Sequence, residues 1–232
     1  MRANLLVSAL SISIVFSFSC AESAYANILD ELEEEDRVLV ERGEQVALTE
    51  DVEDSAWPHV YVYQKIDANP EEVTAIFTDY ELHQEMFREV GIVRSVIINR
   101  PDPATAIVES TMTFPVVFGV QLKDEAFTTW NKVKLLTSSK SYRVDWGSLE
   151  TETIKKIAGD LKIEAFSSGS IIRYHSFIVP SRPNFAQLIV QMAIDRVKQT
   201  IVLFNNQVED EKQNDPQRLL GQVEVLRRVL GK

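Results

Sequence analysis

The chain has 232 residues, of which 45% are hydrophobic and 25% charged, and its formal net charge is −11. This composition is that of an ordinary globular protein, long enough for one domain with a full core. The excess of negative charge argues against nucleic acids and anionic lipid surfaces as partners, because both repel an acidic protein.

Residues 1–26 have the pattern of a secretory signal. Arg2 precedes an apolar stretch, Leu5 to Phe18, that is short for a membrane span, and Ala24-Tyr25-Ala26 offers a small-x-small cleavage site. We expect export, most simply to a periplasm, with no stable membrane span after cleavage. The alternatives are a retained anchor and a lipoprotein acylated at Cys20, although Ser17 stands where a lipobox has an aliphatic residue.

Cleavage after Ala26 would remove Cys20, the only cysteine of the chain. The mature protein would then have no thiol and no disulfide, which suits an oxidising compartment. Cysteine catalysis and thiolate metal sites are excluded for such a protein.

Residues 27–55 are predicted to form an N-terminal extension of the main domain. A helix over 27–43 would end at Gly43, and a strand over 45–52 is expected to pair with the next one, 60–66. The Glu-rich run from Asp30 to Asp36 fits a solvated helix face or a leader.

The segment from 66 to 99 is the most informative part of the sequence. A strand leads into a helix with Asn69 as its cap and Pro70 at its first position, where a missing N–H has no helical partner. A break at Asp79-Tyr80, a second short helix and a strand after Gly91 follow. Helical spacing gives the first helix one apolar face, made of Val73, Ile76, Phe77 and Tyr80.

This segment resembles the opening of the START-like superfamily, also called polyketide-cyclase-like or birch-pollen-allergen-like. The residues that carry the resemblance are Ile66, Ala68, Pro70, Glu71, Val73, Phe77, Asp79, Tyr80 and Met86. Thr74 departs from the pattern, which usually has a bulky aromatic residue there. The resemblance covers residues 56–212. It implies an α+β helix-grip fold, in which a curved antiparallel sheet wraps around a long C-terminal helix, in an exported bacterial member.

Strand signals separated by Pro, Gly and Ser turns continue after Gly91 and indicate an antiparallel, meander-like sheet. Asn184 to Lys212 then has the apolar stripe of a long helix. Residues 213–232 form a tail with one more short helix, docked on the body or on a partner. The predicted strands of the meander are 92–98, 104–114, 120–130, 140–146, 154–166 and 170–179.

Strand alternation and the resemblance together predict an internal cavity for a lipid-like, sterol-like or aromatic molecule. We place its entrance between the helix break at 79–87 and residues 185–192. The predicted rim consists of Tyr80, Met86, Phe87, Phe185, Leu188 and Met192. The predicted interior consists of Met112, Phe114, Asp124, Trp130, Trp146 and Tyr174. The alternative is that the same side chains form a solid core.

Asp124 stands out because a carboxylate on an apolar strand face costs desolvation unless it is paired. It would be a general base or ligand anchor if it faced the cavity. We favour the other interpretation, in which a bulge or a place at the solvated mouth keeps it in water.

Catalytic motifs are not recognisable in the sequence. It has no phosphate-binding loop, HExxH or nucleophile elbow. His59, His83 and His175 show no metal-ligand spacing, so we assign no cofactor, metal or catalytic residue.

Three functions stay open at this point. The first is an exported binding or transport protein for a hydrophobic small molecule. The second is a cyclase or aromatase acting on a polyketide-like substrate, with Asp124, Tyr142 and Tyr174 as the visible acid–base candidates. The third is a protein-interaction module that uses the N-terminal helix and the tail. The sequence does not fix the oligomeric state.

Overall fold

The computed structural model describes residues 27–232 apart from 54, 56, 115, 118–119, 122, 138–139, 152–153 and 181–182. The side chains of 116–117, 120–121, 180 and 183–189 also lie outside the description. The predicted signal, its cleavage site and Cys20 therefore fall outside the described residues.

In the described part of the chain, eight strands form one antiparallel sheet in the order β1-β2-β10-β9-β8-β7-β4-β3. The strands are β1 (Val46–Glu50), β2 (His59–Ile66), β3 (Ile92–Asp102), β4 (Thr105–Met112), β7 (Glu125–Leu136), β8 (Ser141–Thr151), β9 (Ile154–Phe166) and β10 (Gly169–Pro180). A separate two-stranded ribbon consists of β5 (Val116–Val117) and β6 (Val120–Gln121).

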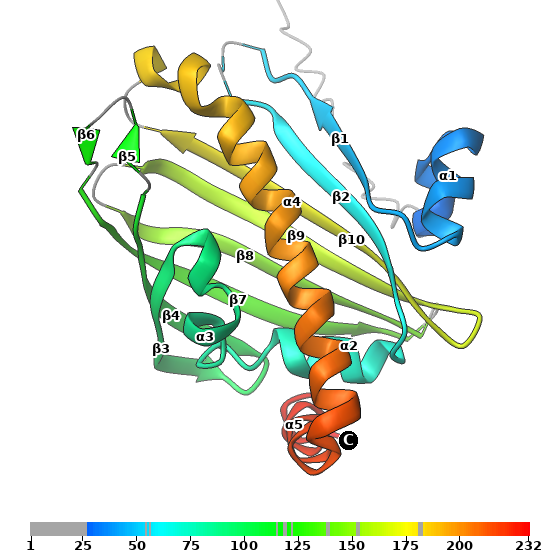
Figure 1. Cartoon of the computed structure of the whole chain (residues 1–232). Helices are drawn as coiled ribbons and strands as arrows, with labels where there is room; N and C mark the ends of the chain where they lie inside the picture. Colours follow the sequence, from blue (N-terminus) through cyan, green and yellow to red (C-terminus); the bar gives the residue numbers. More distant parts are fainter. Residues whose placement is uncertain are drawn as a thin grey trace, which may run out of the picture.

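One long helix lies across one face of this curved sheet (Figure 1). It is α4 (Pro183–Asn214), and the predicted helix-grip α+β fold is confirmed. None of the helices in the described ranges is long and apolar enough to cross a membrane. The other helices are η1 (Ile28–Glu31), α1 (Glu34–Glu41), α2 (Pro70–Phe77), α3 (His83–Met86), η2 (Arg88–Val90) and α5 (Pro216–Val229).

Local signals set the boundaries of α2 and β3. The Asn69 side chain accepts hydrogen bonds from the backbone N–H groups of Glu71 and Glu72, and the Glu72 carboxylate accepts one from the Asn69 N–H, all at 3.0 Å. This reciprocal capping box fixes the start of α2. Gly91 has φ 98°, a left-handed conformation that suits glycine, and it turns the chain into β3.

The C-terminal half of α4 closes the core. Ile201, Phe204 and Val208 are fully buried, and the Phe204 ring meets Phe77 of α2 edge-on at a centroid distance of 5.4 Å. We call the side of the sheet that carries α4 the helix face and the opposite side the outer face. The helix-face residues packed in this core are Val62, Val144, Leu161, Ile163 and Ile172.

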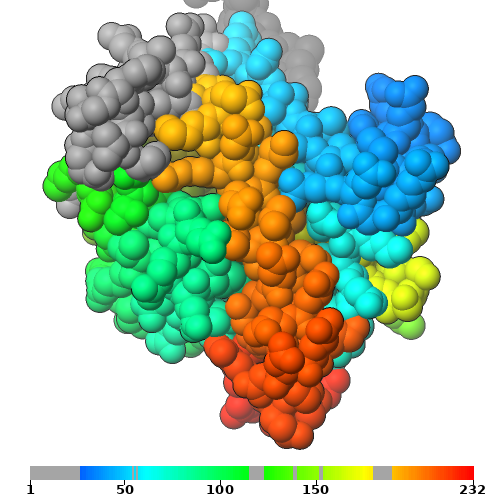
Figure 2. All heavy atoms as spheres, in the orientation of Figure 1, coloured from blue at the N-terminus to red at the C-terminus, as the bar shows by residue number. Residues whose placement is uncertain are grey.

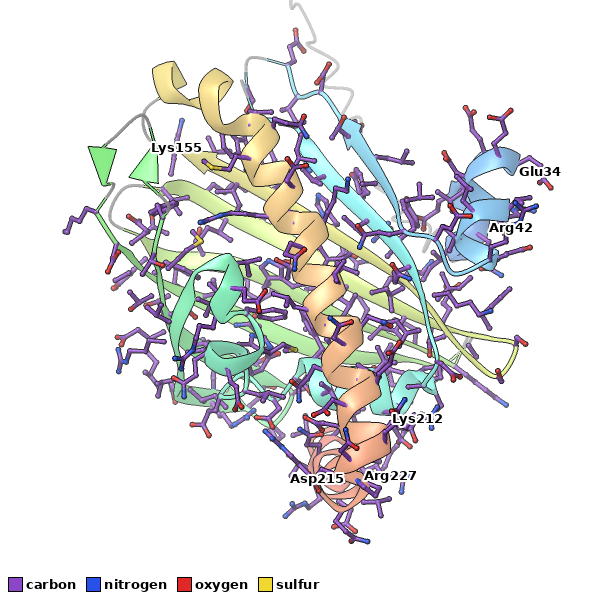
Figure 3. All side chains as sticks on the ribbon, viewed as in Figure 1. Glu34, Arg42, Lys155, Lys212, Asp215 and Arg227 are labelled. Atoms are coloured by element: carbon purple, nitrogen blue, oxygen red, sulfur yellow. The ribbon has the colours of Figure 1, made fainter. Side chains whose placement is uncertain are left out.

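The C-terminal tail packs on the body and not away from it. Leu219, Val223 and Leu226 of α5 are buried in the main core, next to α2. The Arg227 guanidinium donates to both carboxylate oxygens of Glu71, at 3.1 and 2.6 Å. Figure 3 shows Arg227 with Asp215 and Lys212 at this end of the molecule. The tail therefore ties the end of α4 to α2.

The N-terminal segment covers part of the outer face. The predicted helix over 27–43 is two short helices, because Leu32 between them is extended. Ile28 is fully buried, and its N–H donates to the Glu164 carboxylate at 2.8 Å. Glu31 of the Glu-rich run pairs with Lys162 at 3.5 Å and with Arg173 at 3.2 Å. The buried charges of β9 are thus compensated by partners, as burial requires.

Truncating Phe204 should test how strongly α4 holds the sheet. We expect Phe204→Ala to lower the free energy of unfolding by about 3–5 kcal/mol, because it leaves a cavity against Phe77. Denaturant unfolding measures this. Val202→Ala on the solvent side of α4, at a residue 39% exposed, is the control and should change it by less than about 0.5 kcal/mol. Equal effects of the two substitutions would contradict this packing.

His83 should make the fold sensitive to acid. Its Nε2 lies 2.8 Å from the Phe77 carbonyl, so the ring donates there, and the ring also packs against Tyr80 and Phe87. Burial lowers the pKa of His83 to about 4 from 6.5. The unfolded chain therefore binds the proton more tightly, and stability is lost as the pH falls from 6.5 towards 4.

The expected extra loss is at most about 1.4 kcal/mol per pH unit within that window. The free energy of unfolding, measured by urea titration at several pH values, should fall less steeply in His83→Gln than in the wild type. Parallel pH profiles for the two proteins would show that His83 titrates normally in the folded state.

Candidate ligand-binding site

The two halves of the helix face differ in how well they are covered. Beside the C-terminal half of α4, Val144, Leu161 and Ile172 are 0% exposed. The other end of β10 lies near the start of α4 (Figure 1). Trp146 of β8 and Tyr174 of β10, two residues further along their strands than Val144 and Ile172, stay partly exposed. Protein interiors are normally close-packed. Partly exposed aromatic side chains on an inward face therefore indicate space between the sheet and this half of α4.

The floor of this space is aromatic. Trp146 of β8 pairs with Gly159 of β9, and a Cβ added at Gly159 would lie 2.4 Å from the Trp146 ring. Glycine thus lets the indole lie flat on the neighbouring strand. The Trp146 ring centroid is 5.2 Å from Tyr174 and 5.9 Å from Phe77. Burial of most of the Tyr174 side chain raises the pKa of its phenol.

Trp130 does not belong to this floor, and its prediction as a lining residue is wrong. It pairs with Gly147, and a Cβ there would lie 2.8 Å from the Trp130 Nε1. Gly147 follows Trp146 in β8, so it faces the other side of the sheet. Trp130 consequently lies on the outer face.

The error came from the phase assumed for β7. The strand begins at Glu125, and its odd-numbered residues face α4, as Val133 in the main core shows. Lys132 and Lys134 are exposed and share the phase of Trp130. A longer window would have revealed this, because lysines mark the solvent side of a strand.

The acidic residue that faces inward is Glu125, which the sequence analysis missed. Asp124 is exposed just before β7, which matches the interpretation that we favoured and removes it from the cavity lining. Glu125 is 1% exposed and lies opposite Met112 on the helix face. Its carboxylate accepts a hydrogen bond of 3.2 Å from the Ile154 N–H of β9.

Three of the predicted rim residues are core residues. Tyr80, Met86 and Phe87 are 4%, 6% and 5% exposed, so they belong to the core and not to an exposed rim. Chain order could not show this, because an apolar residue at a helix break fits both places. Met192 of α4 is partly exposed, as a rim requires, and Phe114, which was predicted for the interior, is partly exposed too. Phe185 and Leu188 lie on α4, with side chains outside the description.

A few polar groups interrupt the apolar lining. The Asn131 side chain donates to the Thr129 hydroxyl at 3.0 Å, and both residues are buried on the helix face beside Trp146. Ser110 is also buried there. In the part of the chain that the structure describes, no group of three or more His, Cys, Asp or Glu residues is placed to hold a metal ion. The lining therefore offers hydrogen bonds within a mainly apolar surface.

A second hollow lies at the opposite end of α4, between α2 and α5. Its volume is about 330 Å³, and the ion pair of Arg227 with Glu71 borders it. No predicted site residue lines it, and its walls mix charged with apolar side chains. The space above Trp146 differs from this hollow because its lining is mainly apolar.

Comparisons with known proteins agree with this architecture. No family model matches the sequence, and no curated protein matches it either. Solved structures do match. A STAR-related lipid transfer protein from Xanthomonas axonopodis superposes with a TM-score of 0.62 at 11% identity, over 71% of this chain and 93% of that one.

Two further structures are similar at the same level of identity. Human STARD10 has a TM-score of 0.59 at 11% identity, over 75% of this chain and 74% of that one. An aromatase/cyclase from a Streptomyces species has a TM-score of 0.54 at 11% identity, over 67% of this chain and 96% of that one. The chain therefore has the START-like, or polyketide-cyclase-like, fold that its sequence predicted.

Proposed function

We propose that this protein binds and carries a hydrophobic, lipid-like small molecule between the N-terminal half of α4 and the helix face of the sheet. The single observation that carries the proposal is the partial exposure of Trp146 and Tyr174, which face inward and pack against the edge of the main core. The similar structures include a STAR-related lipid transfer protein, and its name supports a lipid-like ligand here as well.

The physical chemistry of such a site is simple. Burying an acyl chain contributes about 0.8 kcal/mol per CH₂ group, so an apolar space suffices without catalytic groups. Trp146 and Tyr174 offer an aromatic surface to the hydrocarbon part of the ligand. Because α4 crosses the surface between the α3 region and strands β1 and β2 (Figure 2), a small shift of its N-terminal half would admit the ligand.

A cyclase or aromatase is the second candidate, favoured by the inward-facing Glu125 and by the similarity to the Streptomyces aromatase/cyclase. Such an enzyme needs acid–base groups converging on one point. Of the groups expected from the sequence, Asp124 is exposed, and Tyr142 lies near Glu71 and Lys232 at the other end of α2. Only Tyr174 of these expected groups faces the space, and the Glu125 carboxylate accepts a hydrogen bond from the Ile154 backbone, so binding without chemistry is the better-supported function.

A role as a protein-interaction module has less support. The exposed large apolar residues of the described chain are spread over several elements and include Val93, Leu149 and Leu220. Single exposed apolar side chains are normal on a protein surface.

We further propose that the carrier is exported and begins at Asn27 after cleavage. Asn27 caps η1, where its side chain accepts from the Leu29 N–H at 3.1 Å. The next residue, Ile28, is fully buried. Cleavage after Ala26 would thus leave the docked N-terminal segment complete.

Filling the space should weaken ligand binding. We expect Met192→Trp to raise the dissociation constant of the neutral fluorescent probe N-phenyl-1-naphthylamine at least about tenfold, a change of about 1.4 kcal/mol, because the indole occupies probe volume. Titration of probe emission measures this, and thermal unfolding checks the fold. Gln191→Trp, at an exposed neighbour on α4, is the matched control and should leave binding unchanged. Unchanged affinity in Met192→Trp would argue for a solid core or another site.

Export can be tested by the N-terminus of the mature protein. Edman sequencing or intact-mass analysis of protein purified from its native host should give a chain that starts at Asn27 and carries no cysteine. A chain that starts at an acylated Cys20 would identify a lipoprotein instead, and a chain that retains Met1 would refute cleavage.

A further inference from the structure

Arg196 of α4 is partly buried, and no carboxylate of the described chain lies within ion-pairing distance of it. The other partly buried arginines all have one: Arg37 pairs with Asp30, Arg143 with Asp145 and Arg173 with Asp160. Arg196 has only a weak hydrogen bond to the Thr113 carbonyl, at 3.4 Å, and a position 5.9 Å from the centre of the Phe114 ring.

This arrangement leaves an unusual charge at one edge of the proposed binding space. A guanidinium carries five N–H donors in a planar fork, and the Thr113 carbonyl uses one of them. Partial burial without a counter-charge is unfavourable, and desolvation lowers the pKa of Arg196 accordingly. The group nevertheless stays charged, because arginine does not lose its proton in proteins.

The surroundings of Arg196 supply no compensating carboxylate. On α4 itself, Asp195 is exposed and accepts from Gln191, and Lys198 is exposed. Across from α4, the chain at Thr113 presents backbone and the Phe114 ring. A carboxylate or phosphate placed against the guanidinium would form charge-assisted, bidentate hydrogen bonds in a partly dehydrated place, where they are strong.

The position of Arg196 relates it to the ligand space. It follows Met192 by four residues, one turn of the helix, so both side chains lie on the same side of α4. Thr113 and Phe114 directly follow Met112, whose side chain is on the helix face opposite Glu125. The partly exposed guanidinium thus contacts the segment that directly continues the lining strand β4.

We propose that Arg196 binds the anionic head group of the ligand, whose hydrocarbon part lies over Trp146 and Tyr174. This inference rests on the proposed carrier function and narrows the ligand to a single-chain amphiphile with a carboxylate or phosphate head. The net charge of −11 does not oppose it, because charges more than about 8 Å away are largely screened at physiological ionic strength.

Competition against bound N-phenyl-1-naphthylamine tests the proposal on the full mature chain. The competitors are palmitate, methyl palmitate and 1-palmitoyl lysophosphatidate, which differ in the head group. We expect the wild type to bind at least one of the two anions about tenfold more tightly than the neutral ester, equal to about 1.4 kcal/mol. The better of the two anions identifies the head group as a carboxylate or a phosphate.

Matched variants assign this preference to one side chain. Arg196→Gln keeps a donor for the Thr113 carbonyl without the charge, and it should bind the preferred anion about tenfold more weakly and the ester unchanged. Arg196→Lys should keep part of the preference. Lys198→Met removes an exposed cation two residues away on the same helix and should behave as the wild type.

The possible failures are distinguishable. Equal affinity of the wild type for the anions and the ester, or an undiminished preference in a stably folded Arg196→Gln protein, would overturn the role of Arg196 and leave the carrier function intact. If the wild type binds neither the probe nor the three lipids, the carrier function fails and this inference fails with it.

Discussion

An eight-stranded antiparallel sheet with one apolar face needs a cover that keeps water from that face, and α4 provides it. Ile201, Phe204 and Val208 are buried in one core with residues of the helix face, and Phe204 meets Phe77 of α2. Burial of each such side chain contributes about 1.5–3 kcal/mol. The sheet, α2 and α5 therefore all depend on the position of the C-terminal half of this helix.

Among the described side chains of α4, the fully buried apolar ones lie in its C-terminal half. The end of α4 is fixed by α5, which packs on α2 and is tied to it by Arg227 and Glu71. Trp146 and Tyr174 on the helix face of the sheet stay partly exposed. A helix that is firmly anchored at one end can leave a space at the other without loss of the fold, which is what a carrier requires.

Buried charged groups have partners on the outer face of the sheet, whereas one partly buried charge near the helix face has none among the described carboxylates. On the outer face, Lys162, Asp160 and Glu164 are buried but paired, in part with Glu31 and Arg173 of other elements. Near the helix face, Arg196 has no carboxylate partner in the described chain. Paired charges hold the N-terminal segment in place, whereas an unpaired one is available to a ligand.

Local sequence determined much of this fold. Asn69 with Glu72 fixed the start of α2, Gly91 the turn into β3, and Asp215 with Pro216 the boundary between α4 and α5, because caps and turns depend on neighbouring residues. The START-like order of elements followed from these signals. The opening pattern from Ile66 to Met86 also predicted the fold that the solved structures share.

Tertiary structure decided the site. The phase of β7, which puts Glu125 inside and Trp130 outside, depends on pairing with β4 and β8. The burial of Met86 depends on how α3 meets the rest of the core, and the contact of Arg196 with Thr113 joins residues 83 positions apart. A residue type and its spacing specify a helix or a strand. Long-range packing decides which apolar residues fill the core and which border a space. Those contacts form only when distant segments of the chain meet.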